Sequence, residues 1–264
     1  YTGYVVTFEL FLLAARACSG GFVTEDTLLY ASAVELLHNA TLLHDDVADD
    51  SPMRRGVPTV MSLLGGRASV LLGDYWLVKG MENILASANS SAKVIRIFAA
   101  TLSDLAEGEL LQLQKADTGD TLEQDYYKII YNKTSSLFVA AATSGAMSVG
   151  ASEDKMKAVR TYAKCLGQAF QIKDDIFDYL DNQQTGKPAG LDLKERKITL
   201  PLLGALKNVS EERAKEIRRM VCNIDDHPDY QKDIVSFVKS EGGMEYAKMR
   251  LQEFVDNAKI ALRP

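Results

Sequence analysis

The chain has 264 residues, of which 47% are hydrophobic and 25% charged, so it is long enough to bury a sizeable core. A net charge of −6 argues against nucleic acid or an anionic membrane as the main partner. Cys18, Cys165 and Cys222 lack the spacing of a disulfide framework or a zinc site, which favours a reduced, cytoplasmic compartment. We find no targeting peptide and no apolar run long enough to span a membrane.

Helical periodicity dominates the chain, and we find no convincing alternation of the kind that marks strands. Glycine, proline and aspartate clusters separate the helical segments. The longest predicted helices cover 25–50, 68–88, 93–116, 121–149 and 154–180. The sequence therefore predicts an all-α fold, a single domain over 1–264 with about ten helices around a central cavity. Because the chain starts at Tyr1 and ends early, we expect truncation at both termini.

The first chemically informative stretch is the acidic end of the segment 25–50. Asp45 and Asp49 are four residues apart, as are Asp46 and Asp50, so each pair is expected to share a helix face. Like charges at this spacing, at the electronegative end of a helix, destabilise it unless something positive lies nearby. Mg²⁺ fits this need, because it takes oxygen ligands and is commonly held by carboxylates together with substrate phosphates.

Two arginines follow this acidic stretch directly. Pro52 should end or kink the helix, which would place Arg54 and Arg55 on a turn folded back beside the carboxylates. A guanidinium group matches the geometry of a phosphate group well. The stretch is equally compatible with a diphosphate site and with a solvated acidic helix end neutralised by two surface arginines.

A second acidic cluster lies about 130 residues further on. Asp174 and Asp178 are four residues apart, Asp175 is adjacent, and Gln171 lies one turn before Asp175 in an otherwise apolar helical segment. Such a segment is poorly explained as a solvated face, so it favours a second metal site. The pair Lys133-Thr134 and the lysines of the loop from 186 to 201 supply positive charge, although each lysine alone is more simply a surface residue.

Together these motifs resemble those of the trans-isoprenyl diphosphate (polyprenyl) synthases. The ordered set comprises the two aspartate-rich motifs, the Arg-Arg-Gly that follows the first, the Lys-Thr pair and the glycine-lysine loop, and the resemblance covers roughly 12–246. It implies the isoprenoid synthase fold, a homodimer and a Mg²⁺-dependent prenyltransferase. The implied reaction joins an allylic diphosphate, such as farnesyl diphosphate, head-to-tail to isopentenyl diphosphate and gives an all-trans polyprenyl diphosphate.

The resemblance also implies roles for individual residues. The ligands of three Mg²⁺ ions would be Asp45, Asp49 and Asp174, with Asp46, Asp175 and Asp178 acting directly or through water. Allylic diphosphate would be bound by Arg54, Lys133, Lys187 and Lys197. Isopentenyl diphosphate would lie near His38 and Arg55. Thr134 and Gln171 would lie near the reacting carbons, and with Lys133 and Lys187 they form the expected catalytic set. His44 receives no role.

Product length can be argued from helix geometry. The growing isoprenoid should run back along the first acidic helix, and one five-carbon unit is about as long as one helical turn, roughly 5.4 Å. Ala40 and Thr41 therefore meet the tail first. Family members with short products often carry aromatic residues here, so small residues predict an open tunnel and a product longer than fifteen carbons, of the quinone side-chain type.

One family motif is missing. Relatives usually carry Gly-Lys-x-x-Arg-Pro near the N-terminus to bind isopentenyl diphosphate, whereas residues 3–8 here read Gly-Tyr-Val-Val-Thr-Phe. Weak binding, a catalytically silent subunit of a prenyl synthase, and an altered or wrongly recorded terminus all explain the difference, and we favour the third. A terpene cyclase is a further alternative, but its second motif usually contains Asn, Ser and Glu. A purely structural bundle would leave both acidic clusters unexplained.

Overall fold

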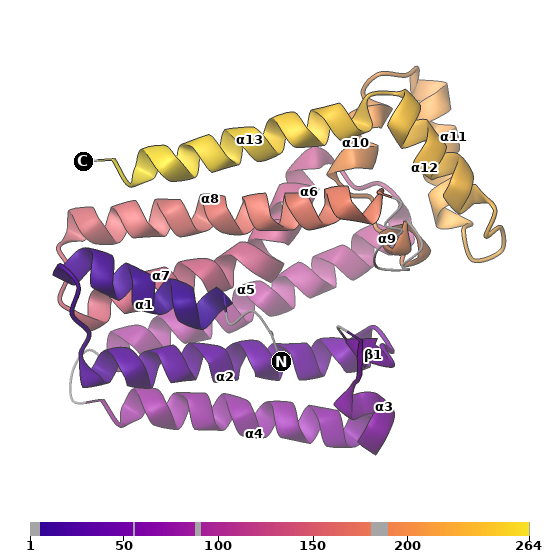
Figure 1. Cartoon of the computed structure of the whole chain (residues 1–264). Coiled ribbons are helices and arrows are strands. Elements are labelled where there is room, and N and C mark those ends of the chain that lie inside the picture. Colours follow the sequence, from indigo (N-terminus) through magenta and orange to yellow (C-terminus); the bar gives the residue numbers. More distant parts are fainter. Residues whose placement is uncertain (1–5, 55, 88–90, 181–189, 264) are drawn as a thin grey trace. The chain divides into compact units, whose positions relative to one another are not determined.

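The all-α prediction is confirmed by the computed structural model, which describes residues 6–54, 56–87, 91–180 and 190–263 (Figure 1). No helix in these ranges is both long and apolar enough to cross a bilayer. The elements in chain order are α1 (Val6–Ser19), α2 (Glu25–Ala48), β1 (Met53–Arg54), β2 (Val57–Pro58), α3 (Val60–Leu64), α4 (Gly66–Leu85), α5 (Ser91–Thr118), α6 (Glu123–Ile130), the π-helical turn η1 (Tyr131–Ser135), α7 (Ser136–Ser148), α8 (Glu153–Asp178), α9 (Leu191–Lys194), α10 (Leu200–Leu206), α11 (Glu211–Cys222), α12 (Tyr230–Ser240) and α13 (Gly243–Ala261).

The chain divides into two compact units, each described here by itself. Unit 1 comprises Tyr1–Thr101 and Leu137–Arg160, and unit 2 comprises Leu102–Ser136 and Thr161–Pro264. The first acidic cluster thus belongs to unit 1 and the second to unit 2. The single polyprenyl synthase domain expected over 1–264 stays a prediction.

In unit 1, α2 packs along α4, and α1 packs against α2 (Figure 1). A capping box starts α2: the Thr24 hydroxyl accepts from the Thr27 N–H, and the Thr27 side chain accepts from the Thr24 N–H. Three glycines seven residues apart, Gly66, Gly73 and Gly80, face α2 from α4, where an added Cβ atom would lie 2.4–3.4 Å from α2. The missing side chains at Gly73 and Gly80 allow the two helices to approach closely, whereas the contact at Gly66 would be an ordinary one.

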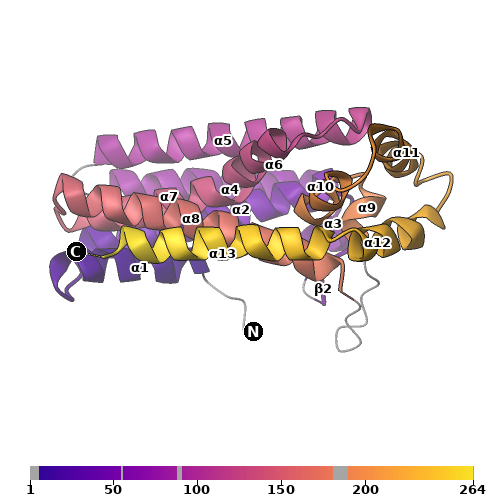
Figure 2. The same cartoon turned by 90° about the horizontal axis from the view of Figure 1, so that it is seen from above.

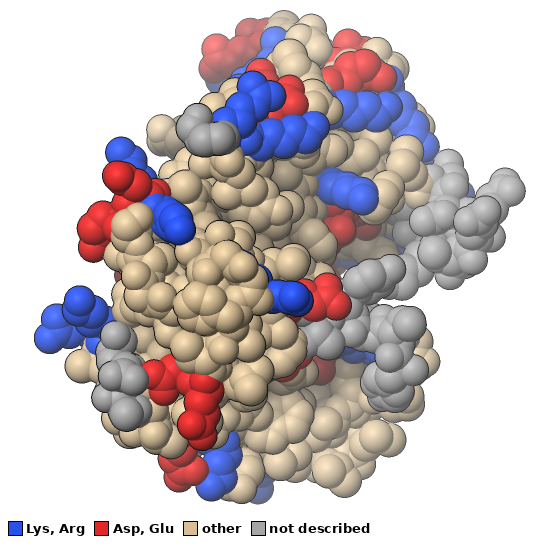
Figure 3. Space-filling view, turned by 60° about the vertical axis from the view of Figure 1, so that its left-hand side comes forward, with Lys and Arg blue, Asp and Glu red and all other residues tan. Residues whose placement is uncertain are grey.

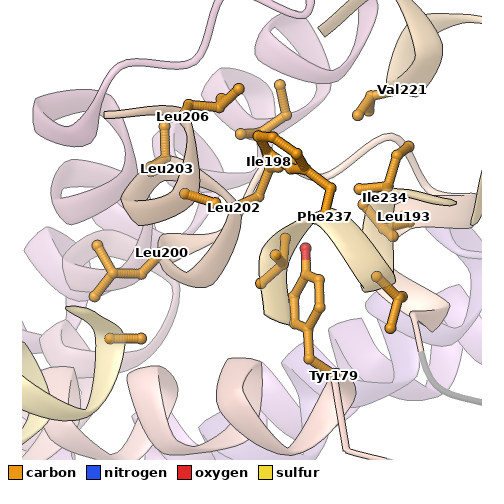
Figure 4. Packing of buried hydrophobic residues seen from close by; sticks show 14 of the residues in the cluster. Tyr179, Leu193, Ile198, Leu200, Leu202, Leu203, Leu206, Val221, Ile234 and Phe237 are labelled. Atoms are coloured by element: carbon orange, nitrogen blue, oxygen red, sulfur yellow. The ribbon is translucent and has the colours of Figure 1, made fainter. Parts of the chain in front are cut away.

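In unit 2, a core of buried apolar side chains gathers α6, α9, α10 and α12 around the end of α8 (Figure 4). The side chains of Tyr179, Leu193, Leu200, Leu202 and Ile234 are fully enclosed. Helix α10 packs against α12 and α13, and α11 against α12 (Figure 2). This core holds the C-terminal end of α8, which carries the second acidic cluster.

The predicted helices lie within a few residues of the observed ones, but two local features differ from the predictions. Strands β1 and β2 pair in antiparallel fashion, with Arg54 opposite Val57; these two-residue strands are too short to show alternation. The segment 121–149 is also not one α-helix, because η1 interrupts it.

Charged side chains are interspersed on the surface drawn in Figure 3. Lys and Arg side chains lie beside Asp and Glu side chains, and the described residues form no extended basic patch on that face.

Candidate active site

The first acidic cluster lies where α2 ends. Helix α2 stops at Ala48, and the N–H of Asp49 still donates to the carbonyl of Asp45 at 2.8 Å, so Asp49 follows Asp45 by one helical turn, as expected. Asp50 lies outside the helix with φ +47°. The expectation that Asp46 and Asp50 share a helix face is therefore wrong.

Asp46 is only 4% exposed, and it has a cationic partner. Its Oδ1 accepts from Nε of Arg54 at 2.8 Å. The turn after Pro52 brings β1 back beside α2, and the Thr59 hydroxyl holds it there by donating to the Ser51 carbonyl at 2.7 Å. Arg54 uses Nε for this bond, and a guanidinium group has further N–H donors to offer a phosphate. Arg55 lies outside the described residues.

The helical turn before Asp45 is fixed by α4. The buried Ser69 hydroxyl donates to the Leu43 carbonyl at 2.8 Å, and Nε2 of His44 lies 3.2 Å from Oδ1 of Asp74. The His44 ring stands over Gly73, where a Cβ atom would approach Nε2 to 2.4 Å. The sequence analysis assigned no role to His44 and did not single out Ser69 or Asp74; the repeat of glycine every seven residues in α4 was the available signal.

The residues expected along the substrate tail lie earlier on α2. Ala40 is fully buried and Thr41 half-buried. The Thr41 hydroxyl donates to the carbonyl of His38 at 2.8 Å, and His38 itself is half-buried. Thr41 is therefore the more accessible of the two predicted tunnel residues.

The second cluster, at the end of α8, contains one exposed carboxylate, one half-buried and one buried. Asp174 is exposed. Both oxygens of Asp178 accept backbone N–H groups, from Leu191 at 2.9 Å and from Asp192 at 3.2 Å. Burial raises the pKa of Asp178, and burial together with the carboxylates of Asp175 and Asp178 raises the pKa of Asp192 to about 7. The sequence did not indicate a role for Asp192.

Asp175 is 3% exposed, and both of its oxygens are occupied. Tyr126 donates its hydroxyl proton to Oδ2 at 2.6 Å, and Nε2 of Gln171 donates to Oδ1 at 2.9 Å. Oε1 of Gln171 in turn accepts from the Thr134 hydroxyl at 2.8 Å. Burial raises the pKa of Asp175 to about 6, although the bonds from Tyr126 and Gln171 lower it. Two predicted residues, Thr134 and Gln171, are thus brought together, and Tyr126 is an unpredicted member of the same network.

Lys133 and Thr134 both lie in η1, whose backbone is closely approached by two glycines. A Cβ atom at Gly108 would lie 2.7 Å from Cβ of Asn132, and one at Gly167 would lie 2.6 Å from Cα of Ser135. π-helical turns inside α-helices are frequent at functional sites. The glycines in α5 and α8 therefore leave the space that η1 occupies.

The described lysines of the predicted site have acidic neighbours. Nζ of Lys133 lies 2.5 Å from Oε2 of Glu109 on α5, a residue that the sequence analysis did not identify. Lys197 forms an ion pair with Glu195. Lys187 lies outside the described residues.

The donor chemistry suits Mg²⁺, which prefers oxygen ligands. Asp49 and Asp174 are exposed, Asp45 and Asp178 are half-buried, and Asp46 and Asp175 are buried. Within the described residues, no three His, Cys, Asp or Glu side chains converge as a ready metal site.

Comparison with known proteins decides the family. A family model described as "Polyprenyl synthetase" matches residues 9–238. The chain belongs to the polyprenyl synthetase family. It is 36% identical over 253 residues to octaprenyl diphosphate synthase of Escherichia coli, a match that covers 96% of this chain and 77% of that one.

Solved polyprenyl synthases have the same fold. A decaprenyl diphosphate synthase from Rhodobacter capsulatus matches with a TM-score of 0.91 at 35% identity, covering 98% of this chain and 79% of that one. A polyprenyl synthase from Caulobacter crescentus, complexed with calcium and isoprenyl diphosphate, matches with a TM-score of 0.88 at 34% identity. The match covers 98% of this chain and 78% of that one. The family and the fold predicted from the motifs are confirmed.

Proposed function

We propose that this polyprenyl synthetase is a trans-prenyltransferase that condenses an allylic diphosphate with isopentenyl diphosphate head-to-tail. Its product is an all-trans polyprenyl diphosphate longer than fifteen carbons. The observation that carries the proposal is 36% identity to an octaprenyl diphosphate synthase over 96% of the chain. A diphosphate substrate also suits a chain with carboxylates for metal ions and basic residues beside them.

The carboxylates of the two clusters divide into two groups. Asp45, Asp49 and Asp174 would bind Mg²⁺, for which we keep the expectation of three ions. When bound, Mg²⁺ stabilises the negative charge of the diphosphate leaving group. Asp46, Asp175 and Asp178 have protein donors on their oxygens, so their main contribution would be to fix Arg54, Gln171 and the α9 backbone.

The cations would bind the diphosphate. Arg54 keeps Nε on Asp46 and offers its other N–H donors, and Lys133 is oriented by Glu109. Lys197 and the undescribed Lys187 complete the allylic set, and His38 and Arg55 the isopentenyl set. The allylic C–O bond breaks with its electron pair passing to the diphosphate, and the double bond of isopentenyl diphosphate attacks the resulting cation to form the new C–C bond. The departing diphosphate then takes a proton from the adduct cation, and the C–H electron pair forms the new double bond.

A homodimer is supported by an apolar stripe on unit 1. Leu71, Val78 and Leu85 on α4 are seven residues apart, and each is more than half exposed. Such spacing places them along one line of the helix surface, and exposed apolar stripes mark protein contacts. We infer that a second copy of the chain covers this stripe. The cytoplasmic location expected from the sequence stays a prediction.

The test is an elongation assay with the purified protein, Mg²⁺, farnesyl diphosphate and labelled isopentenyl diphosphate. We expect elongated products beyond fifteen carbons, and their loss when EDTA removes the metal. Turnover to a cyclic hydrocarbon would instead identify a terpene cyclase. No turnover would point to a silent subunit.

A further inference from the structure

The hydroxyl group of Tyr126 has no part in the function proposed above, although it is buried and in direct contact with the second cluster. Tyr126 lies on α6, is 3% exposed, and its ring belongs to the apolar core of unit 2. A buried tyrosine hydroxyl normally finds a partner. Here the partner is Oδ2 of Asp175, at 2.6 Å, which makes this a short, charge-assisted bond.

In both hydrogen bonds to Asp175, the carboxylate is the acceptor. An ionised carboxylate only accepts hydrogen bonds, so Tyr126 and Gln171 both donate to it. Because Nε2 of Gln171 faces Asp175, Oε1 faces Thr134 and accepts its hydroxyl proton. The Thr134 hydroxyl therefore commits its proton to the network, and its oxygen can present lone pairs away from the network.

From this geometry we propose that Tyr126 is a positioning residue: it anchors Asp175, which sets the orientation of the Gln171 amide and, through it, of the Thr134 hydroxyl. The inference rests on the proposed function, in which Thr134 and Gln171 lie near the reacting carbons. When the Thr134 oxygen presents its lone pairs, it stabilises the positive charge that develops on carbon as the allylic C–O bond breaks. A rotated hydroxyl group would present its proton and lose this stabilisation.

The neighbouring residue provides a matched control. Tyr127 also lies on α6 and packs against the same core, but its hydroxyl accepts from Nε of Arg250 at 2.8 Å. Tyr126→Phe and Tyr127→Phe each remove one hydroxyl and retain the ring. We expect Tyr126→Phe to lower kcat 10- to 100-fold with both KM values nearly unchanged, as is typical when a group supporting a site is lost. Tyr127→Phe should keep kcat within about twofold.

A double variant tests whether Tyr126 acts through Thr134. In a Thr134→Val background there is no hydroxyl to orient, so adding Tyr126→Phe should lower kcat less than about twofold further. If the double variant instead lost kcat by the product of the two single-variant factors, the inference would be overturned. Equal kcat losses in the two tyrosine variants would also overturn it.

Two further measurements keep the test decisive. If wild-type protein does not elongate, the proposed function fails; the inference is then judged from crystal structures, where Tyr126→Phe should move Asp175 or Gln171 from its wild-type rotamer and unchanged rotamers would overturn it. If Tyr126→Phe does not fold, Asp175→Asn takes its place, because an amide in that position can donate to Gln171 and reverse the chain of bonds. The same loss of kcat at constant KM is expected, and unchanged kcat would refute the inference.

Discussion

At the residue scale, the pair Arg54–Asp46 is a structural contact as well as a candidate substrate contact. Arg54→Ala would leave the enclosed Asp46 carboxylate without its cationic donor. We expect the free energy of unfolding to fall by about 1–3 kcal/mol, measured by urea denaturation. Arg67→Ala, at an exposed position on α4, should stay within about 0.5 kcal/mol of wild type. Equal effects of the two changes would contradict a stabilising role for the pair.

Thr41 provides the sharper test of product length. The half-buried position can take a larger side chain, so Thr41→Phe should shorten the product by obstructing the tail, as seen by chromatography of the dephosphorylated products. Thr41→Val keeps the volume and should leave the length unchanged. Ala40→Phe should also shorten the product. Because Ala40 is fully buried, the larger side chain should overpack the site and lower the free energy of unfolding by about 1–3 kcal/mol. A Thr41→Phe enzyme with wild-type products would argue against the tunnel.

At the element scale, the glycines beside η1 should be sensitive to a single methyl group. Gly108→Ala and Gly167→Ala should each gain about 1 kcal/mol of helix propensity. The added Cβ atom would, however, lie within 3 Å of η1, at Asn132 for Gly108 and at Ser135 for Gly167. Overpacking costs typically about 1–3 kcal/mol, so we expect net destabilisation and a lower kcat.

Gly66→Ala is the control for these two changes, because its Cβ atom would meet only the end of the Val47 side chain at an ordinary 3.4 Å. Gly66→Ala should leave the melting temperature in thermal denaturation unchanged or raise it slightly. If all three alanine variants behaved alike, the close approach of α5 and α8 to η1 would not be needed.

The first turn of α6 contributes a pH-dependent contact in unit 2. Glu123 accepts from the Tyr246 hydroxyl at 2.7 Å and forms an ion pair with Lys207. Burial acts to raise the pKa of Glu123, but the bonds from Lys207 and Tyr246 bring it below its usual value. A carboxyl group with a lowered folded-state pKa adds stability that is present above the unfolded-state pKa, about 4.3, and is lost as the pH falls through the folded-state value.

Glu123→Gln should therefore be less stable than wild type at pH 7, with the difference shrinking from about pH 5 downward. Urea denaturation at pH 7, 5, 4 and 3 measures this. Glu245→Gln, at an exposed position on α13, serves as the control. A difference that stayed constant across this range would show that the Glu123 contact does not depend on its charge.

At the scale of the whole molecule, the stripe on α4 predicts the oligomeric state. Leu71→Lys with Val78→Lys would place two charges in the proposed contact between copies, so we expect a dimer to become a monomer in size-exclusion chromatography with light scattering. Leu13→Lys on α1, a change at an equally exposed apolar residue outside the stripe, should leave the dimer intact. A wild-type protein that is already monomeric would contradict the inference.

The sequence predicted the long helices well, because apolar periodicity and glycine breaks are local signals. It also predicted the family from the ordered motifs. It could not show that Asp46 and Asp175 are buried while Asp174 is exposed, since that depends on packing between helices. Tyr126 and Glu109 were missed for the same reason: each meets its partner only through tertiary contacts, and nothing adjacent in the chain marks them.

The π-helical turn has a consequence for how insertions and deletions would act here. A π turn holds one residue more than an α turn, so it behaves as a one-residue insertion in a regular helix. Removing a single residue from Tyr131–Ser135 would restore an uninterrupted ladder of main-chain bonds but rotate everything on one side of it by about 100°. Such a shortened chain could be as helical as before and yet turn Lys133 and Thr134 onto a different face, so length is as strict a requirement in this segment as residue identity.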